Sequence, residues 1–340
     1  MKKISFFIIA ILLGLSTQAI AQGEHKLSIF VGYPPGANYD LHARVLARHI
    51  SKHLPASTAV VVQNMPGAGS LKAANFIYNN APKDGWTIGL FARGMAAQPI
   101  LDPNGVAFDP RKFSWIGSPS SEASVVFASA GRPFKTLDDV KRREMILAAS
   151  GSGSDSVIFP YILNGVLGTK FKVVTGYPGS ADLLLAVERG EADGNAGTSW
   201  GNLFANRPDW IRDKKIVLLA QLGTRPHKDL PNVPFIMDMA TNDDDRRIFE
   251  LIFSRQTAAY PFAAPPDVPK AQLEILRKAF DATMKDKDYL ADAKRSSLEI
   301  DPTSGEEIDA IVASLFNTPD AVITRTKKVL RDGEAATVQR

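Results

Sequence analysis

The chain contains no cysteine among its 340 residues. This absence excludes disulfide bonds, thiol chemistry and a lipid-modified N-terminal cysteine. An excess of one charge is also lacking, because the formal net charge is only +4. No basic run is interleaved with aromatic residues, so we expect no nucleic-acid partner. Phosphate-loop and dinucleotide-binding glycine motifs are missing as well, and we expect no cofactor.

The one long apolar run lies at the N-terminus. Lys2 and Lys3 precede an apolar stretch over residues 4 to 15, and Ala19-Ile20-Ala21 then places small residues at the spacing that signal peptidase requires. The run is about a dozen residues long, short of the roughly 20 that span a bilayer as a helix. The sequence therefore predicts that residues 1 to 21 are a signal peptide, cleaved before Gln22, and that the mature protein is soluble and periplasmic.

The remaining chain is long enough for two domains. Removal of 21 residues from 340 leaves 319, and a single hydrophobic core stops growing near roughly 250 to 300 residues. Apolar strands alternate with amphipathic helices, which predicts parallel sheets covered by helices. The first series has strands at residues 27 to 31, 59 to 62 and 86 to 91, and the second at 145 to 149, 171 to 175, 192 to 196 and 216 to 220.

The predicted fold class is therefore α/β, with two lobes that each contain a mainly parallel sheet flanked by helices. We expect lobe 1 to comprise residues 22 to 118 plus 222 to 340, and lobe 2 to comprise residues 119 to 221. A long amphipathic helix in the C-terminal third carries Leu273, Leu276, Phe280 and Met284 on one stripe.

The loops that open helices are candidate anion sites, because helix N-termini carry unpaired backbone N–H groups and a partial positive charge. Residues 33 to 37 precede the first helix, for which Asn38 is the expected N-cap. In lobe 2, the loops at residues 151 to 154 and 177 to 180 add hydroxyl donors. Each loop taken singly also fits a purely structural role. Their recurrence at the carboxyl ends of strands favours a binding site, because open α/β sheets bind ligands there.

Four blocks of sequence follow one another in order along the chain. They are Tyr33-Pro34-Pro35-Gly36-Ala37-Asn38-Tyr39-Asp40, then Gln63-Asn64-Met65-Pro66-Gly67-Ala68-Gly69, then Gly176-Tyr177-Pro178-Gly179-Ser180 with Glu188-Arg189-Gly190-Glu191-Ala192-Asp193-Gly194. Together they resemble the Bug family of extracytoplasmic receptors, the substrate-binding components of tripartite tricarboxylate transporters. The similarity runs from about Lys26 to about Leu330.

The resemblance implies a two-lobed periplasmic-binding-protein fold, of the Venus flytrap and type II-like kind, that binds a small organic carboxylate and is not an enzyme. By motif position it implies a proximal loop at residues 33 to 40, a distal loop at residues 177 to 180, and a cleft lined by residues 152 to 155. The implied partners are a large and a small integral membrane subunit of a transporter. Similar receptors also serve sensors, and we expect the receptor itself to be a monomer.

Two charged residues allow more than one interpretation. Arg93 lies where the resembling receptors usually place small or hydroxyl residues, and it can either pair with a second carboxylate of the ligand or be solvated or paired internally. Asp40 favours the positive end of a helix but would repel an incoming anion. We interpret Asp40 as a residue that organises its loop.

Catalysis is the alternative function, because Gly197-Thr198-Ser199-Trp200-Gly201 matches the nucleophile turn of serine hydrolases after a predicted strand. The single histidine after Ser199 is His227, and no oxyanion segment of the His-Gly-Gly type precedes it. We therefore expect Thr198 or Ser199 to cap a helix and Trp200 to form a wall of the cleft.

A metal site is the last candidate, since His49 and His53 stand four residues apart on one predicted helix. No third ligand is in view, so we expect a solvated helix face and no metal. The complete set of expected ligand-binding residues is Tyr33, Pro35, Gly36, Ala37, Asn38, Asp40, Asn64, Arg93, Ser152, Gly153, Ser154, Asp155, Tyr177, Gly179, Ser180, Thr198 and Trp200.

Overall fold

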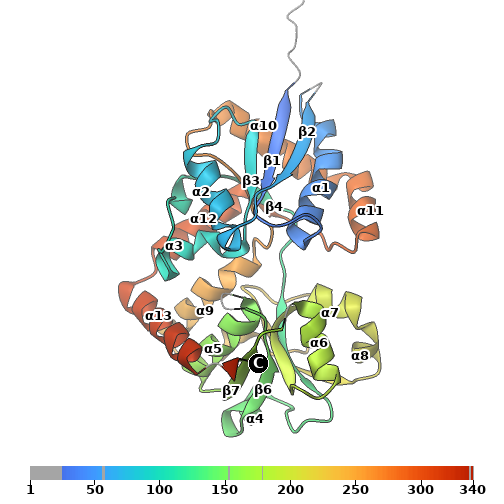
Figure 1. The fold of residues 1–340 in the computed structure, drawn as a ribbon, viewed down its shortest axis with the longest axis vertical. Coiled ribbons are helices and arrows are strands. Elements are labelled where there is room, and N and C mark those ends of the chain that lie inside the picture. Colours follow the sequence, from blue (N-terminus) through green and yellow to red (C-terminus); the bar gives the residue numbers. More distant parts are fainter. Residues whose placement is uncertain (1–24, 56–57, 152–153, 178, 337, 340) are drawn as a thin grey trace, which may run out of the picture.

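Two six-stranded sheets divide the protein into two lobes, one above the other in Figure 1. The structure is a computed structural model that describes residues 25 to 55, 58 to 151, 154 to 177, 179 to 336 and 338 to 339. The expected signal peptide, Ser152 and Gly153 lie outside the described residues. Within the described part of the chain, no helix combines the length and apolar character needed to cross a membrane.

Lobe 1 is built on a sheet with the strand order β11-β4-β10-β3-β1-β2. Helices α1, α10 and α11 pack on one face of this sheet, and α2 and α12 pack on the other. The elements are β1 (Lys26–Val31), α1 (Asn38–Ile50), β2 (Ala59–Asn64), α2 (Leu71–Asn79), β3 (Thr87–Leu90), α3 (Gln98–Leu101), β4 (Ser114–Ser118), β10 (Phe262–Ala264), α10 (Lys270–Lys285), α11 (Lys287–Arg295), β11 (Thr303–Ser304) and α12 (Gly305–Phe316).

Lobe 2 is built on a sheet with the strand order β12-β7-β6-β8-β5-β9. Helices α4, α5, α9 and α13 pack on one face, and α6, α7 and α8 pack on the other. The elements are β5 (Ser124–Ser129), α4 (Leu137–Arg142), β6 (Met145–Ala148), α5 (Asp155–Leu167), β7 (Phe171–Thr175), α6 (Ser180–Glu188), β8 (Gly194–Ser199), α7 (Trp200–Asn206), α8 (Pro208–Arg212), β9 (Ile216–Leu222), α9 (Asp243–Phe253), α13 (Asp320–Ala335) and β12 (Val338–Gln339).

Local sequence accounts for most of these elements. In β1 the alternate residues Leu27, Ile29 and Val31 are fully buried, as period-two patterning requires. The predicted strand at residues 171 to 175 is confirmed as β7. The predicted C-terminal stripe is confirmed in α10, which buries Leu276, Phe280 and Met284.

Both sheets are mixed, whereas the sequence predicted mainly parallel ones. β1, β2 and β3 are parallel, but β10 is antiparallel to β3 and β4. Likewise β6, β7 and β8 are parallel, but β5 is antiparallel to β8 and β9. β5 and β10 each enter their sheet from the other lobe. They therefore start at the edge where the parallel strands end and run in the opposite direction.

The C-terminal third is divided between the lobes, in contrast to the expected assignment of residues 222 to 340 to lobe 1. Apolar residues of α9 and α13, such as Phe249 and Val322, join the lobe 2 core beside Val126 of β5. The chain returns to lobe 1 only after α9, enters β10, and crosses again between α12 and α13. An amphipathic pattern shows that a helix has an apolar face, but it does not show which lobe covers that face.

Candidate ligand-binding site

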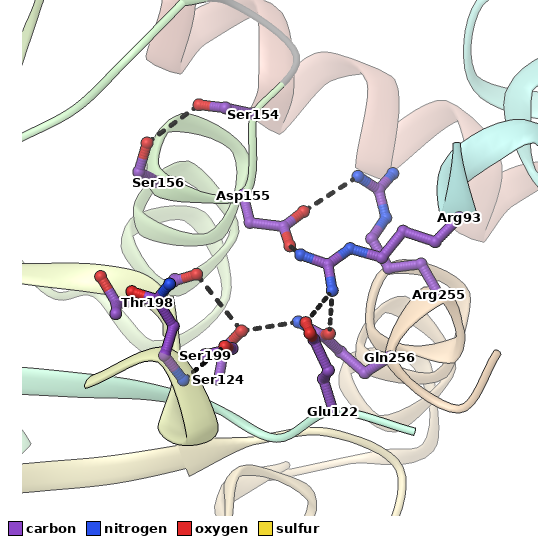
Figure 2. Close-up of polar contacts among 12 residues, drawn as sticks. Arg93, Glu122, Ser124, Ser154, Asp155, Ser156, Thr198, Ser199, Arg255 and Gln256 are labelled. Atoms are coloured by element: carbon purple, nitrogen blue, oxygen red, sulfur yellow. Dashed lines mark hydrogen bonds and ion pairs between the residues drawn. The ribbon is translucent and has the colours of Figure 1, made fainter. Parts of the chain in front are cut away.

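A cluster of charged side chains joins the two lobes at the point where the chain crosses between them. The Arg93 Nη1 donates to Glu122 Oε2 at 2.5 Å and to Gln256 Oε1 at 3.0 Å. The Arg93 Nη2 forms an ion pair with Asp155. The Arg255 Nη1 lies 3.3 Å from the other oxygen of the same carboxylate. Figure 2 shows both guanidinium groups pointing toward Asp155.

The members of this charged cluster come from four separate segments of the fold. Arg93 begins a short 3-10 helix (Arg93–Ala96) just after β3 in lobe 1, and Asp155 is the first residue of α5 in lobe 2. Glu122 lies between β4 and β5, and Arg255 and Gln256 lie between α9 and β10. The cluster therefore connects both lobes through two of the crossing segments.

The cluster is largely shielded from water. The exposed fractions of the side chains are 21% for Arg93, 19% for Glu122 and 9% for Asp155. Burial alone would lower the pKa of Arg93, but the negative charges of Asp155 and Glu122 outweigh it and raise that pKa well above its usual value. Arg93 is thus a permanent cation between the lobes.

Aromatic rings support the lobe 1 side of the cluster. Tyr33 stacks on Tyr39 at a centroid distance of 4.3 Å, and the Tyr39 ring meets Tyr260 edge-on at 4.9 Å. The Tyr39 hydroxyl accepts the backbone N–H of Arg93 at 3.1 Å, and the Tyr260 hydroxyl donates to Glu122 at 2.9 Å. These contacts fix the position of Arg93 and of its acidic partner.

Two of the rings near the cluster are held in their neutral form by burial. Burial lowers the pKa of His42, which stacks on Tyr260 at 3.7 Å, to about 3. Burial raises the pKa of Tyr33, although the positive charge of Arg93 opposes this rise. His42 is therefore a neutral support, and Tyr33 keeps its proton as a hydrogen-bond donor.

Asp40 organises the proximal loop, in agreement with its interpretation from sequence. Its side chain is 3% exposed and accepts hydrogen bonds from the Gly36 N–H at 2.9 Å, from Arg44 at 2.8 Å and from Asn64 at 2.8 Å. Burial alone would raise the pKa of Asp40, but these hydrogen bonds outweigh it and lower that pKa. Asn64 also donates to the Tyr33 carbonyl at 2.9 Å. Asp40 and Asn64 thus shape the loop from behind.

The expected N-cap role of Asn38 is wrong. The N-cap of α1 is Ala37, which makes no side-chain cap hydrogen bond, and Asn38 is an exposed residue of the first turn. Asp40 instead holds the preceding loop against the first turn of α1 by accepting the Gly36 N–H. Pro35 and Gly36 are also exposed at this end of lobe 1, and Gly36 has the positive φ of 83° that glycine readily adopts.

On the lobe 2 side, β8 approaches the start of α5 closely. Gly197 has a φ of 111°, and a Cβ at this position would lie 2.7 Å from the backbone carbonyl of Asp155. Thr198 points its hydroxyl to the Asn195 side chain at 2.6 Å and away from Asp155. The Ser154 hydroxyl lies 2.9 Å from that of Ser156 within the same turn. The hydroxyl groups of Thr198 and Ser154 thus have partners within lobe 2, and Asp155 is positioned by the close backbone packing of Gly197.

The described residues of the distal loop, Tyr177, Gly179 and Ser180, lie in the lobe 2 core and at the start of α6. The Tyr177 ring is buried in the lobe 2 core, and its hydroxyl donates to Glu191 at 3.3 Å. Gly179 is the N-cap of α6 and Ser180 is an exposed residue of its first turn. Trp200 also packs in the lobe 2 core at 7% exposure, so the expectation that it lines the cleft is not met.

Ser199 has the geometry of a helix cap. Its hydroxyl accepts the Asn202 N–H at 3.2 Å at the start of α7, as the capping alternative predicted. The His227 Nδ1 accepts the Asp229 N–H at 3.2 Å, and its Nε2 lies 3.4 Å from Glu299. Both ring nitrogens thus have partners other than Ser199, and the structure gives no support to the hydrolase alternative.

His49 and His53 pair with acidic residues of the neighbouring helix region. The His49 Nε2 lies 2.9 Å from Asp292, and the His53 Nε2 lies 3.1 Å from Asp286. No group of three or more potential metal ligands is found among the residues that the structure describes. The two histidines therefore connect α1 and its C-terminal extension to α11.

Several residues of the charged cluster and of its aromatic support were not among the ligand-binding residues expected from the sequence, namely Tyr39, Glu122, Arg255, Gln256 and Tyr260. Glu122 lies only four residues after Ser118, where a crossing between lobes was expected. Arg255 and Gln256 follow a helix whose lobe was assigned incorrectly. A cavity of about 200 Å³ adjoins the cluster, is lined in part by Glu122 and Gln256, and extends toward Arg225 and His227.

The fold and the site define a class of protein: a two-lobed α/β binding protein with charged and hydroxyl groups between its lobes. Comparison with known proteins gives the family. Residues 42 to 327 match the model of the tripartite tricarboxylate transporter family receptor. The chain belongs to this family, which confirms the resemblance to the Bug receptors.

Individual relatives are distant but extend over most of the chain. A UPF0065 protein of Cupriavidus necator is 22% identical over 310 residues, which cover 89% of this chain and 88% of the relative. A solute-binding protein from Polaromonas, solved without ligand, is 19% identical with a TM-score of 0.70 and covers 92% of this chain and 99% of its own.

A second solved structure was determined with a ligand. MatC from Rhodopseudomonas palustris with bound malate is 18% identical with a TM-score of 0.60, covering 90% of this chain and 98% of its own. These structural similarities show the two-lobed fold. Together with the family they indicate a periplasmic solute-binding receptor.

Proposed function

We propose that this protein captures a small organic carboxylate in the periplasm and delivers it to the large and small integral membrane subunits of a tripartite tricarboxylate-type transporter. The observation that carries the proposal is the position of Arg93 and Arg255, two guanidinium groups between the lobes at the N-terminus of α5. A guanidinium binds a carboxylate through two parallel hydrogen bonds. Relatives solved with malate and adipate support this ligand class.

Binding is coupled to the relative position of the lobes. Arg93 belongs to lobe 1, whereas the first backbone N–H groups of α5 belong to lobe 2. A ligand that contacts both groups stabilises the arrangement in which they are close together, because it gains contacts there that the open arrangement lacks. The membrane subunits then recognise the closed arrangement.

A thermal-shift screen tests the ligand class. The purified protein is melted with monocarboxylates, dicarboxylates, tricarboxylates, aromatic acids and amino acids. A ligand at a hundred times its Kd adds roughly 2.7 kcal/mol to the free energy of unfolding. At least one acid is therefore expected to raise Tm, and a screen in which no acid does so would contradict the proposal.

Two variants connect the shift to the site. Arg93→Met removes the cation between the lobes, so the shift produced by the acid should be lost. Lys278→Met removes an equal charge from α10, where the lysine side chain is 79% exposed, and should leave the shift unchanged. Equal shifts in both variants would place the binding elsewhere.

Export is the other part of the proposal. Residues 1 to 21 act as a signal peptide that is removed before Gln22. The intact mass of the protein isolated from the periplasm should therefore correspond to a chain that starts at Gln22. A mass that still includes these residues would argue for a retained anchor.

A further inference from the structure

Two arginines share one carboxylate between the lobes. Arg93 and Arg255 each contact a different oxygen of Asp155. The side chains of Asp155 and Arg255 are only 9% and 10% exposed. Arg93 also pairs with Glu122, so two guanidinium cations face two carboxylates, and their charge is balanced only while Asp155 stays in place.

Arg255 has unused hydrogen-bonding capacity. A guanidinium carries five N–H donors, yet the one side-chain partner found for Arg255 among the described residues is Asp155 at 3.3 Å. The Arg255 Nε is buried without a hydrogen-bond partner. The guanidinium lies against Gly94, where a Cβ would be 3.6 Å from it. An unsatisfied buried donor on a cation is costly, so the site favours an additional acceptor.

The two acids of the cluster are held differently. Glu122 accepts hydrogen bonds from Tyr260 at 2.9 Å and from Arg93 at 2.5 Å, so it is fixed from two sides. Asp155 has no side-chain partner other than the two arginines within the described residues. Rotation of its side chain would free both guanidinium groups without moving α5. Asp155 is therefore the acid that a competing anion can replace.

We infer that Arg93 and Arg255 form the subsite for one carboxylate of the ligand, that a second carboxylate meets the first backbone N–H groups of α5, and that Asp155 occupies the arginine subsite until the ligand arrives. The ligand is then a small acid with at least two carboxylates, one of which displaces Asp155. This inference rests on the proposed function and specifies its ligand class. It also gives Asp155 an inhibitory role, because the ligand must compete with a carboxylate that is covalently part of the protein.

Calorimetric titration of the purified protein tests the subsite with matched pairs of acids. The dicarboxylates are succinate, glutarate and adipate, and the monocarboxylates are butyrate, valerate and hexanoate. Asp155→Asn removes the competing charge. If Asp155 leaves the subsite open about a tenth of the time, the variant should bind dicarboxylates roughly tenfold more tightly, because apparent affinity scales with the competent fraction. Monocarboxylates have no second acid group to displace Asp155, so their affinity should change less than that of the dicarboxylates.

Further variants separate the subsite from a general charge effect. Asp138→Asn removes one acid from α4, where the side chain is 68% exposed, and should change neither affinity. Arg255→Gln should remove the preference for dicarboxylates over monocarboxylates. Arg255→Lys keeps the charge but loses the two-pronged donor, and should retain part of that preference. If Arg255→Gln does not fold by circular dichroism, Arg255→Lys and Asp155→Asn together decide.

The inference is overturned if Asp155→Asn leaves dicarboxylate affinity unchanged or weakens it, or if it tightens mono- and dicarboxylates equally. It is also overturned if Arg255→Gln and Arg255→Lys keep the full preference for dicarboxylates. These outcomes leave the proposed function intact as long as the unmodified protein binds some acid. If neither the unmodified protein nor folded Asp155→Asn binds any acid, the proposed function fails as well.

Discussion

Substitution of Gly197 by alanine should weaken the fold at the point that positions Asp155. The new Cβ would lie 2.7 Å from the carbonyl carbon and oxygen of Asp155 and 2.8 Å from the Ser156 nitrogen. These are backbone atoms, which cannot rotate away. The φ of 111° adds strain of about 1 to 3 kcal/mol for a residue with a side chain, and overpacking costs about 1 to 3 kcal/mol. We expect a total loss of about 2 to 6 kcal/mol in the free energy of unfolding.

Urea unfolding followed by circular dichroism measures this loss as a lower midpoint at constant slope. Two glycine-to-alanine controls separate its causes. Gly168 has a φ of 70°, but an added Cβ there would meet nothing within 4 Å, so Gly168→Ala should show the backbone strain alone, about 1 kcal/mol. Gly131 has neither a positive φ nor a close neighbour, so Gly131→Ala should be nearly neutral.

The clash also has a functional consequence. Relief of the contact requires the start of α5 to move away from β8, which would shift Asp155 relative to Arg93. Gly197→Ala should therefore alter acid affinity, whereas Gly168→Ala, at the other end of α5, should not. If Gly197→Ala proves no less stable than Gly168→Ala, the close packing of β8 against α5 would be refuted.

Three further predictions concern single side chains. Asp40→Asn should cost about 1 to 3 kcal/mol of unfolding free energy in urea and weaken acid binding, because an amide replaces a buried carboxylate that accepts from three donors. Asp292 has its pKa lowered to about 2, chiefly by hydrogen bonds from Arg48 and His49. Its stabilising contribution is therefore complete above about pH 4, the range of an unfolded aspartate, and is lost as pH falls through about 2. Asp292→Asn should flatten the acid limb of the stability curve. Ser199→Ala should cost about 0.5 to 2 kcal/mol as a lost cap and leave calorimetric acid affinity unchanged, and an esterase activity that this variant abolishes would restore the hydrolase alternative.

The alternation of strands and helices could be predicted from the sequence because it depends on local patterns. Alternate apolar residues such as Leu27, Ile29 and Val31 mark a strand wherever it is placed. Proline and glycine breakers likewise mark the loops that precede helices. The family blocks are also contiguous in sequence, so the family could be identified without coordinates.

The direction of β5 and β10 and the lobe of α9 could not be predicted in this way. β5 and β10 follow crossings between the lobes, whereas α9 precedes one, and an apolar pattern does not show which core buries each element. The strand direction depends on the edge at which the chain enters the sheet. That edge is a property of the assembled lobes.

The charged cluster shows the same division most clearly. The sequence by itself determined that Arg93 follows a strand and that Asp155 begins a helix in a glycine-rich and serine-rich region. Only the tertiary structure decided that these two residues, 62 positions apart, form an ion pair, and that Arg255, a further 100 positions from Asp155, joins them. Periodicity and capping act over a few residues, whereas ion pairs between lobes depend on how the chain crosses from one core to the other.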